Sequence, residues 1–145
     1  MEDIDYQIEE WLDKGGVQAR LFIEAQGKDA ELVKNSLQQL IEQLKKEPDL
    51  LVYKAETDEV IQDRQTKNFT SLIEAELVAK DLRRLTQIVM RYGPSAVEIL
   101  APESIKISMG EAQDLLMDTS EVVSTLTHEI YRLRIKVGEK VPLKK

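Results

Sequence analysis

Side chains that could do chemistry are few in this chain, and they stand far apart. The sequence holds one histidine, His128, and no cysteine, so a single copy cannot build a zinc site from histidines or thiolates. Nothing resembles a Ser-His-Asp set, and the Gly-x-Ser-x-Gly arrangement is missing. We therefore expect no catalytic residue and no bound metal.

Carboxylates are the one reactive group present in number. Glu74 and Glu76 share one face of a predicted strand with Leu72 and Val78. Such a pair could hold a metal ion or a substrate, but the interpretation we favour is a solvated or edge-facing surface. The six glycines fit neither the P-loop nor the dinucleotide-binding spacing. We expect a protein that is not an enzyme and carries no cofactor.

The composition is typical of one globular domain. The chain has 145 residues, 42% of them hydrophobic and 32% charged, which is enough for a core of its own. A net charge of −7 argues against nucleic acid as the main partner, because phosphate binding needs a concentrated cationic surface. No apolar run approaches the ~18 residues of a membrane span, and the acidic N-terminus is unlike a signal peptide. We expect a cytoplasmic protein without a membrane partner.

The elements that must position these residues follow from hydrophobic periodicity. Alternating apolar residues predict strands, and apolar residues at helical spacing predict helices. The predicted strands are 17–25, 50–61, 69–78 and 96–100, and the predicted helices are 2–14, 27–46, 80–92 and 108–136.

Three local signals mark helix ends. Asp29 is a candidate N-cap. Tyr92 is followed by Gly93, which supplies a left-handed residue, and by Pro94, which forbids extension. Ser108 begins Ser-Met-Gly-Glu, a capping box that opens the last helix.

The order β-α-β-β-α-β after the first helix predicts an α+β fold. Two right-handed βαβ halves joined by a hairpin make a four-stranded antiparallel sheet with helices on one face. This is the ferredoxin-like βαββαβ sandwich, and it resembles the fold of ACT-type regulatory domains. The expected segments are an acidic N-terminal helical arm (1–16), the ferredoxin-like domain (17–107), a long C-terminal helix (108–137) and a basic tail (138–145).

Residues 73–105 also look like the C-terminal extension of WYL-domain transcriptional regulators. In that extension a strand and a helix end in an aromatic-Gly pair, followed by a short strand reading roughly V-E-V-L-E-P. Ala101 departs from the pattern, and the matching residues here are Tyr92, Gly93, Val97, Glu98, Ile99, Leu100 and Pro102. The WYL core and the helix-turn-helix are absent, so the resemblance supports the fold and implies little about function.

The resemblance to ACT-type domains implies a ligand site at the loop after the first strand. This loop consists of Gln26, Gly27, Lys28 and Asp29, where free backbone N–H groups could hold a small anion. The alternative is an ordinary turn between a strand and its helix.

The C-terminal helix carries the strongest interaction signal. The helix can be read as a heptad repeat with positions a to g. The a positions are Leu116, Val123, Ile130 and Val137, and the d positions, interleaved at 4-3 spacing, are Ala112, Thr119, Leu126 and Leu133. β-branched residues at a with leucine at the later d positions favour two strands, and Glu129 at g faces Arg134 at e across a parallel seam. Leu115 and Val122 widen the stripe, which is also typical of a helix that packs on its own sheet.

The N-terminal arm leaves two interpretations open. Gly15 and Gly16 end its helix and predict a flexible joint. The arm either packs onto the body and buries Trp11, or it presents Trp11 to a partner.

The sequence therefore predicts a non-enzymatic protein-interaction or assembly domain that forms a homodimer. A different protein partner is an additional possibility, and small-molecule sensing of the ACT type is the alternative function. The predicted interface residues are Trp11, Leu116, Val123, Leu126, Ile130 and Leu133.

Overall fold

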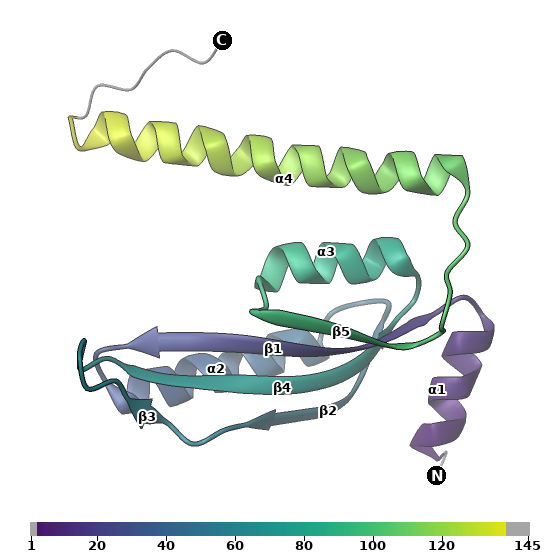
Figure 1. Ribbon diagram of the computed structural model, residues 1–145, viewed down its shortest axis with the longest axis horizontal. Coiled ribbons are helices and arrows are strands. Elements are labelled where there is room, and N and C mark those ends of the chain that lie inside the picture. Colours follow the sequence, from purple (N-terminus) through teal and green to yellow (C-terminus); the bar gives the residue numbers. More distant parts are fainter. Residues whose placement is uncertain (1–2, 139–145) are drawn as a thin grey trace. The chain divides into compact units, whose positions relative to one another are not determined.

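The computed structural model describes residues 3–138 of the chain. The chain divides into two compact units, Met1–Lys106 and Ile107–Lys145. The first is an α+β unit built around an antiparallel sheet (Figure 1), and the described part of the second is dominated by one helix. Apart from Gly138, the predicted basic tail lies outside the described residues. Within residues 3–138, no helix combines the length and the apolar character that crossing a membrane requires.

Four longer strands and one short strand form the sheet. They are β1 (Val17–Gly27), β2 (Leu50–Thr57), β3 (Ile61–Gln62), β4 (Phe69–Ala79) and β5 (Ala96–Ala101). Their order is β2-β4-β1-β5, with β3 also paired to β4, and each of these pairings is antiparallel. β1 and β4 are therefore the central strands, and β2 and β5 lie at the edges (Figure 1).

Alternation of buried side chains along the central strands builds the core, as predicted for residues 17–25, and at the end of β4 Val78 is buried as well. Leu21 lies opposite Ala75 and Ile23 opposite Ile73, so the buried rows of both strands face the same side. The buried members of these rows are Val17, Ala19, Leu21 and Ile23 on β1, and Ser71, Ile73, Ala75, Leu77 and Ala79 on β4.

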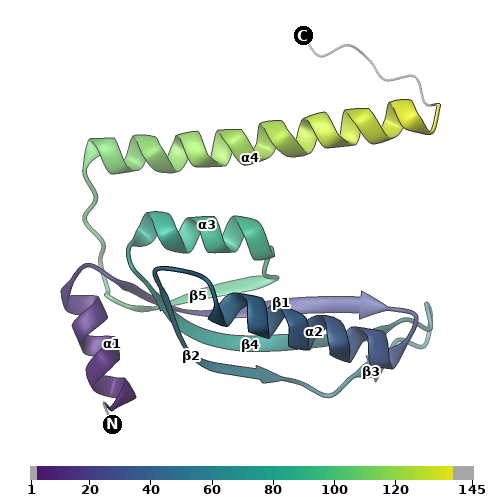
Figure 2. The same cartoon turned by 180° about the vertical axis from the view of Figure 1, so that it is seen from behind.

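Two helices cover that side of the sheet. α2 (Ala30–Lys45) buries Val33, Leu37, Ile41 and Leu44, and α3 (Leu82–Tyr92) buries Leu85 and Ile88. All six side chains belong to one cluster with the buried rows of the strands. α2 lies behind the sheet in Figure 1 and in front of it in Figure 2. The opposite face of the central strands is left uncovered by these two helices.

The helix ends confirm the three local signals. The Asp29 side chain accepts a hydrogen bond from the Glu31 N–H at 2.8 Å, and the Ser108 hydroxyl accepts one from the Glu111 N–H at 3.1 Å. Gly93 follows α3 with φ 55°, in the left-handed region that favours glycine.

The predicted start of the second main helix at residue 80 is wrong by two residues. Asp81 takes the N-cap position, and its carboxylate accepts a hydrogen bond from the Arg84 N–H at 2.8 Å. An N-cap residue has extended backbone, so α3 begins after it, at Leu82.

The predicted strand 50–61 is interrupted in the structure. β2 ends four residues early, and β3 resumes after residues 58–60. The Asp58 carbonyl accepts a hydrogen bond from the buried Ser71 hydroxyl at 2.8 Å, while the Asp58 N–H donates to the Leu72 carbonyl at 3.0 Å. A hydrogen bond from the Ser71 side chain thus replaces a backbone hydrogen bond between the two strands. The chain therefore leaves the regular strand at this edge.

On β5, two apolar side chains lie on the helix-covered side of the sheet without being buried. Val97 lies opposite Leu21, and Ile99 opposite Ala19, so both face the helix-covered side. Both side chains are nevertheless exposed. β5 is an edge strand, whereas the contacts of α2 and α3 with the sheet centre on β1, β2 and β4.

α1 (Ile4–Asp13) packs at the end of the sheet where β1 begins and β4 ends. The Gly16 N–H donates to the Trp11 carbonyl at 2.8 Å. A Cβ on Gly16 would lie 2.6 Å from that oxygen and 3.0 Å from a methyl group of the fully buried Val78. The second glycine therefore serves close packing, which the prediction of a flexible joint did not include.

Candidate interaction surfaces

α4 (Met109–Lys136) is a single α-helix of 28 residues and contributes no buried residue. Its apolar stripe is open along its length, and Met109 and Val137 are exposed at the two ends. The five predicted interface residues of this helix are exposed too: Leu116 by 72%, Val123 by 57%, Leu126 by 57%, Ile130 by 52% and Leu133 by 54%. An exposed apolar stripe of this length is a candidate interaction surface.

Charged side chains flank the C-terminal half of the stripe. Glu129 precedes Ile130 and accepts three hydrogen bonds from Arg132, at 2.8 to 3.1 Å, within the same helix. Both side chains of this ion pair are about half exposed or more, so it contributes roughly 0.2–1 kcal/mol. Such a weak pair can be exchanged for another without a large loss of free energy.

Trp11 lies in α1 and is partly buried. Together with Lys14, Asp49 and Lys80 it lines a small surface pocket of about 360 Å³. α1 packs against β1 and β4, so Trp11 is held at a fixed place beside the sheet. Its role in an interface stays a prediction.

The four residues predicted to bind a small anion run from the end of β1 to the N-cap of α2. Gln26 and Gly27 are the last residues of β1, and Lys28 is exposed. A Cβ on Gly27 would lie 3.2 Å from a Val33 methyl group, so this glycine allows the strand end to approach α2. The Asp29 carboxylate caps α2 and would repel an anion there. Anion binding by these four residues stays a prediction.

A larger pocket of about 570 Å³ lies between the first half of α2 and the interrupted edge of the sheet. Its volume is in the range of small-molecule sites. Leu37 and Phe69 are among its apolar lining residues, and Lys34 on α2 is joined there by Asp58 and Glu59 of the interruption. Sequence reasoning missed this pocket because it depends on the break between β2 and β3.

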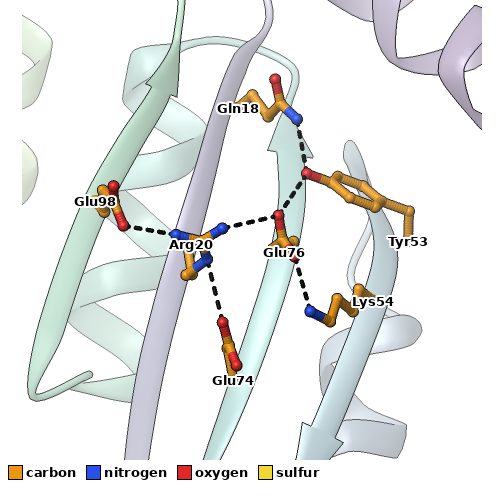
Figure 3. Close-up of polar contacts among 7 residues, drawn as sticks. All are labelled: Gln18, Arg20, Tyr53, Lys54, Glu74, Glu76 and Glu98. Atoms are coloured by element: carbon orange, nitrogen blue, oxygen red, sulfur yellow. Dashed lines mark hydrogen bonds and ion pairs between the residues drawn. The ribbon is translucent and has the colours of Figure 1, made fainter.

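The face of the sheet opposite α2 and α3 carries a network centred on Arg20 (Figure 3). Three carboxylates surround its guanidinium: Nη1 lies 2.8 Å from Glu98, Nη2 3.4 Å from Glu76 and Nε 3.3 Å from Glu74. Arg20 on β1 is paired with Glu76 on one side and with Glu98 on the other. Cross-strand register alone therefore brings these groups together.

The edge strand β2 adds two groups to this network through a bulge. The register shifts between Val52 and Lys54, which leaves Tyr53 as an extra residue. Lys54 Nζ lies 3.3 Å from one Glu76 oxygen, and the Tyr53 hydroxyl donates to the other at 3.4 Å. Gln18 in turn donates to the Tyr53 hydroxyl at 2.7 Å (Figure 3). The bulge explains how two consecutive residues of one strand reach the same carboxylate.

The carboxylates of this face are used in ion pairs. The hydrogen bond to Glu98 raises the pKa of Arg20, and the hydrogen bond to Glu76 raises that of Lys54. Glu74 and Glu76, weighed above as a metal or substrate pair, each face Arg20. In the part of the chain that the structure describes, no three metal-binding side chains are gathered together. The network is suited to hold four strands in register under a polar surface.

A second polar cluster, which the sequence did not indicate, surrounds Glu47. Its side chain is only 8% exposed and accepts hydrogen bonds from Arg84 at 2.7 Å, from Arg91 at 2.7 Å and from the Tyr92 hydroxyl at 2.9 Å. Burial raises the pKa of Glu47, but the hydrogen bonds from Arg91, Tyr92 and Arg84 outweigh it and hold the pKa below its ordinary value. Burial and the bond to Glu47 raise the pKa of Tyr92 to about 12.

No curated protein and no solved structure matches the chain. A family model described as the MJ0538 family matches residues 18–142, which cover β1 from its second residue and every later element through α4.

Proposed function

The chain belongs to the MJ0538 family, and we propose that it is a non-enzymatic protein-interaction domain that pairs with a second copy of itself through α4. The observation that carries the proposal is the exposed stripe on α4, since this helix buries none of its own residues. Helices draw most of their stability from packing an amphipathic face. Burying one Leu, Ile or Val side chain contributes about 1.5–3 kcal/mol, so a partner for this stripe stabilises both helices.

The proposal includes a ferredoxin-like fold for the sheet unit. The strand order β2-β4-β1-β5 supports it, together with antiparallel pairing throughout these strands. The positions of α2 after β1 and of α3 after β4 support it too. α1 and β3 are then additions to the βαββαβ pattern.

Substitution of one stripe residue tests the self-association. Ile130→Glu places a charge in the C-terminal half of the stripe, and burying an unpaired charge in an apolar seam is strongly unfavourable. We expect the wild-type chain to scatter light as twice its 16.6 kDa mass and the Ile130→Glu variant to scatter as a monomer.

Thr125→Glu is the matched control, because Thr125 is exposed on the same helix outside the stripe. It adds the same charge and should leave the dimer intact. A wild-type chain that stays monomeric at every concentration would contradict the proposal, as would an Ile130→Glu variant that remains dimeric.

A second candidate function is small-molecule sensing, which the 570 Å³ pocket beside α2 favours. Its walls carry Lys34 on one side and Asp58 and Glu59 on the other, so polar small molecules with both signs of charge fit its chemistry. A thermal-shift screen of amino acids and nucleotides tests it. A true ligand raises the melting temperature of the wild type and not of a Lys34→Ala variant; no stabilisation by any compound counts against sensing.

A further inference from the structure

We propose that the two α4 helices pair in parallel and in register, so that each stripe residue faces its own copy. This inference rests on the proposed self-association and adds the orientation of the second copy. Apolar a and d rows can pack in either orientation, so the residues beside the rows must decide between them.

The stripe is long enough, and of the right composition, for a two-stranded coil. Counted from Met109, a and d positions continue to Val137 over four heptads, the length a coiled coil needs. Its C-terminal half has β-branched residues at a and leucines at d, the combination that favours parallel dimers. These exposed residues are Val123, Ile130 and Val137 at a, and Leu126 and Leu133 at d.

The parallel orientation matches opposite charges. In a parallel pair each g residue faces the e residue of the following heptad on the other helix. Glu129 at g then faces Arg134 of the second copy, and the symmetry of the dimer makes this contact twice. Since the bond between Glu129 and Arg132 of the same helix is half-exposed, Glu129 can turn to the new partner at little cost.

The antiparallel orientation mismatches the same charge. Two antiparallel registers overlap the helices most, and in both of them g residues face g residues. Glu129 then lies opposite Leu115 in one register and opposite Val122 in the other. A carboxylate against an aliphatic side chain loses water without gaining a partner, which is unfavourable. Charge complementarity along the seam therefore selects the parallel pair.

The polar d residue Thr119 is compatible with this seam. Its hydroxyl donates to the Leu115 carbonyl at 2.9 Å within its own helix, so burial leaves no donor unsatisfied. Thr119 and Ala112 fill the first heptads less completely than leucine, so the C-terminal half of the stripe makes the tighter contact.

Cysteine crosslinking distinguishes the orientations, because the chain contains no cysteine of its own. A disulfide needs Cα atoms within about 7 Å. In the parallel pair Leu116 faces Leu116 and Leu133 faces Leu133 of the other copy. In the two antiparallel registers, Leu116 of one copy is displaced by at least ten residues from Leu116 of the other, and the same holds for Leu133. Ten residues correspond to about 15 Å along the helix axis.

We expect mild oxidation to convert most of a Leu133→Cys chain, and of a Leu116→Cys chain, to disulfide-linked dimer. Thr125→Cys on the outer side of α4 is the control and should stay uncrosslinked. Dimeric mass in light scattering without a disulfide at either position would overturn the orientation and leave self-association standing. Monomeric mass for the wild type would overturn both.

Discussion

Among single residues, Glu47 joins elements that are far apart in the sequence. It lies in the connection between α2 and β2, and its carboxylate receives hydrogen bonds from Arg84, Arg91 and Tyr92 of α3. Arg84 Nε also donates to the Pro48 carbonyl at 2.9 Å. The cluster thus fastens the α2–β2 connection to the second helix of the core.

Glu47→Gln should lower the free energy of unfolding by about 2 kcal/mol near neutral pH, because three charge-assisted or strong bonds lose the ionised acceptor. The pKa of Glu47 is depressed below 4.5 in the folded chain, so its contribution is present above that pH. The contribution is lost as the pH falls through the folded pKa. Urea denaturation at a series of pH values measures the difference between wild type and variant.

The control for this prediction is Glu31→Gln. The Glu31 side chain is 75% exposed and its carboxylate lies 3.9 Å from the Lys34 amine, so the change should stay within about 0.5 kcal/mol. A Glu47→Gln variant as stable as the wild type, or a difference that grows below pH 4.5, would contradict the assignment.

The clusters at Glu47 and Arg20 differ in how far sequence could anticipate them. Glu74 and Glu76 were recognised as one strand face, and the register of β1 and β4 is what supplies Arg20 as their partner. Glu47 carried no pattern, because its partners are 37 to 45 residues away and reach it only after α3 has packed. Pattern reasoning finds what is local; long-range polar contacts require the fold.

At the scale of the elements, the junction between α1 and β1 can be tested by adding one methyl group. Gly16→Ala places Cβ 2.6 Å from the Trp11 carbonyl oxygen and 3.0 Å from Val78, so backbone must move. We expect a loss of about 2 kcal/mol in the free energy of unfolding. Fluorescence of Trp11, the only tryptophan, reports the transition in urea.

Gly110→Ala is the opposite case and serves as the control. Gly110 lies in the first turn of α4, and the nearest atom to an added Cβ is the Ser108 hydroxyl at 3.8 Å. Alanine should raise helix stability by about 0.5–1 kcal/mol, seen as greater helical circular dichroism on heating. Equal effects of the two substitutions would contradict the close packing described at Gly16.

Most elements could be predicted because their signals are local. The stripe of α2, the caps at Asp29 and Ser108, and the stop at Gly93 each depend on a few neighbouring residues. The break in residues 50–61 could not be predicted, since it involves a hydroxyl from another strand, that of Ser71. The exposure of Val97 and Ile99 on β5 could not be predicted either, because it depends on how far the helices extend across the sheet.

For the whole molecule, the division into two units gives a direct prediction. The hydrophobic core cluster lies entirely between Val17 and Ile105, so the chain truncated after Lys106 should fold without α4. We expect it to be monomeric, with cooperative unfolding like that of the full chain. Light scattering and thermal denaturation measure both properties; aggregation, or loss of cooperative unfolding, would contradict this independence.

The stripe on α4 follows from one sequence, whereas its occupant depends on a second chain. Heptad spacing predicted a surface, and the structure leaves Leu116, Val123, Leu126, Ile130 and Leu133 exposed along it. The charge at Glu129 supports a second copy as that occupant, and crosslinking is the measurement that tests it.

The segment 102–108 between β5 and α4 gives a parallel pair a further property. It spans at most about 25 Å, so two sheet units would be tethered near the common start of both helices. Any surface of the sheet unit would then be presented in two copies, at an effective concentration in the millimolar range. Contacts that are weak for a single copy would gain about 10²–10⁴ in avidity toward a repetitive or two-fold symmetric partner, and removing α4 would abolish that gain.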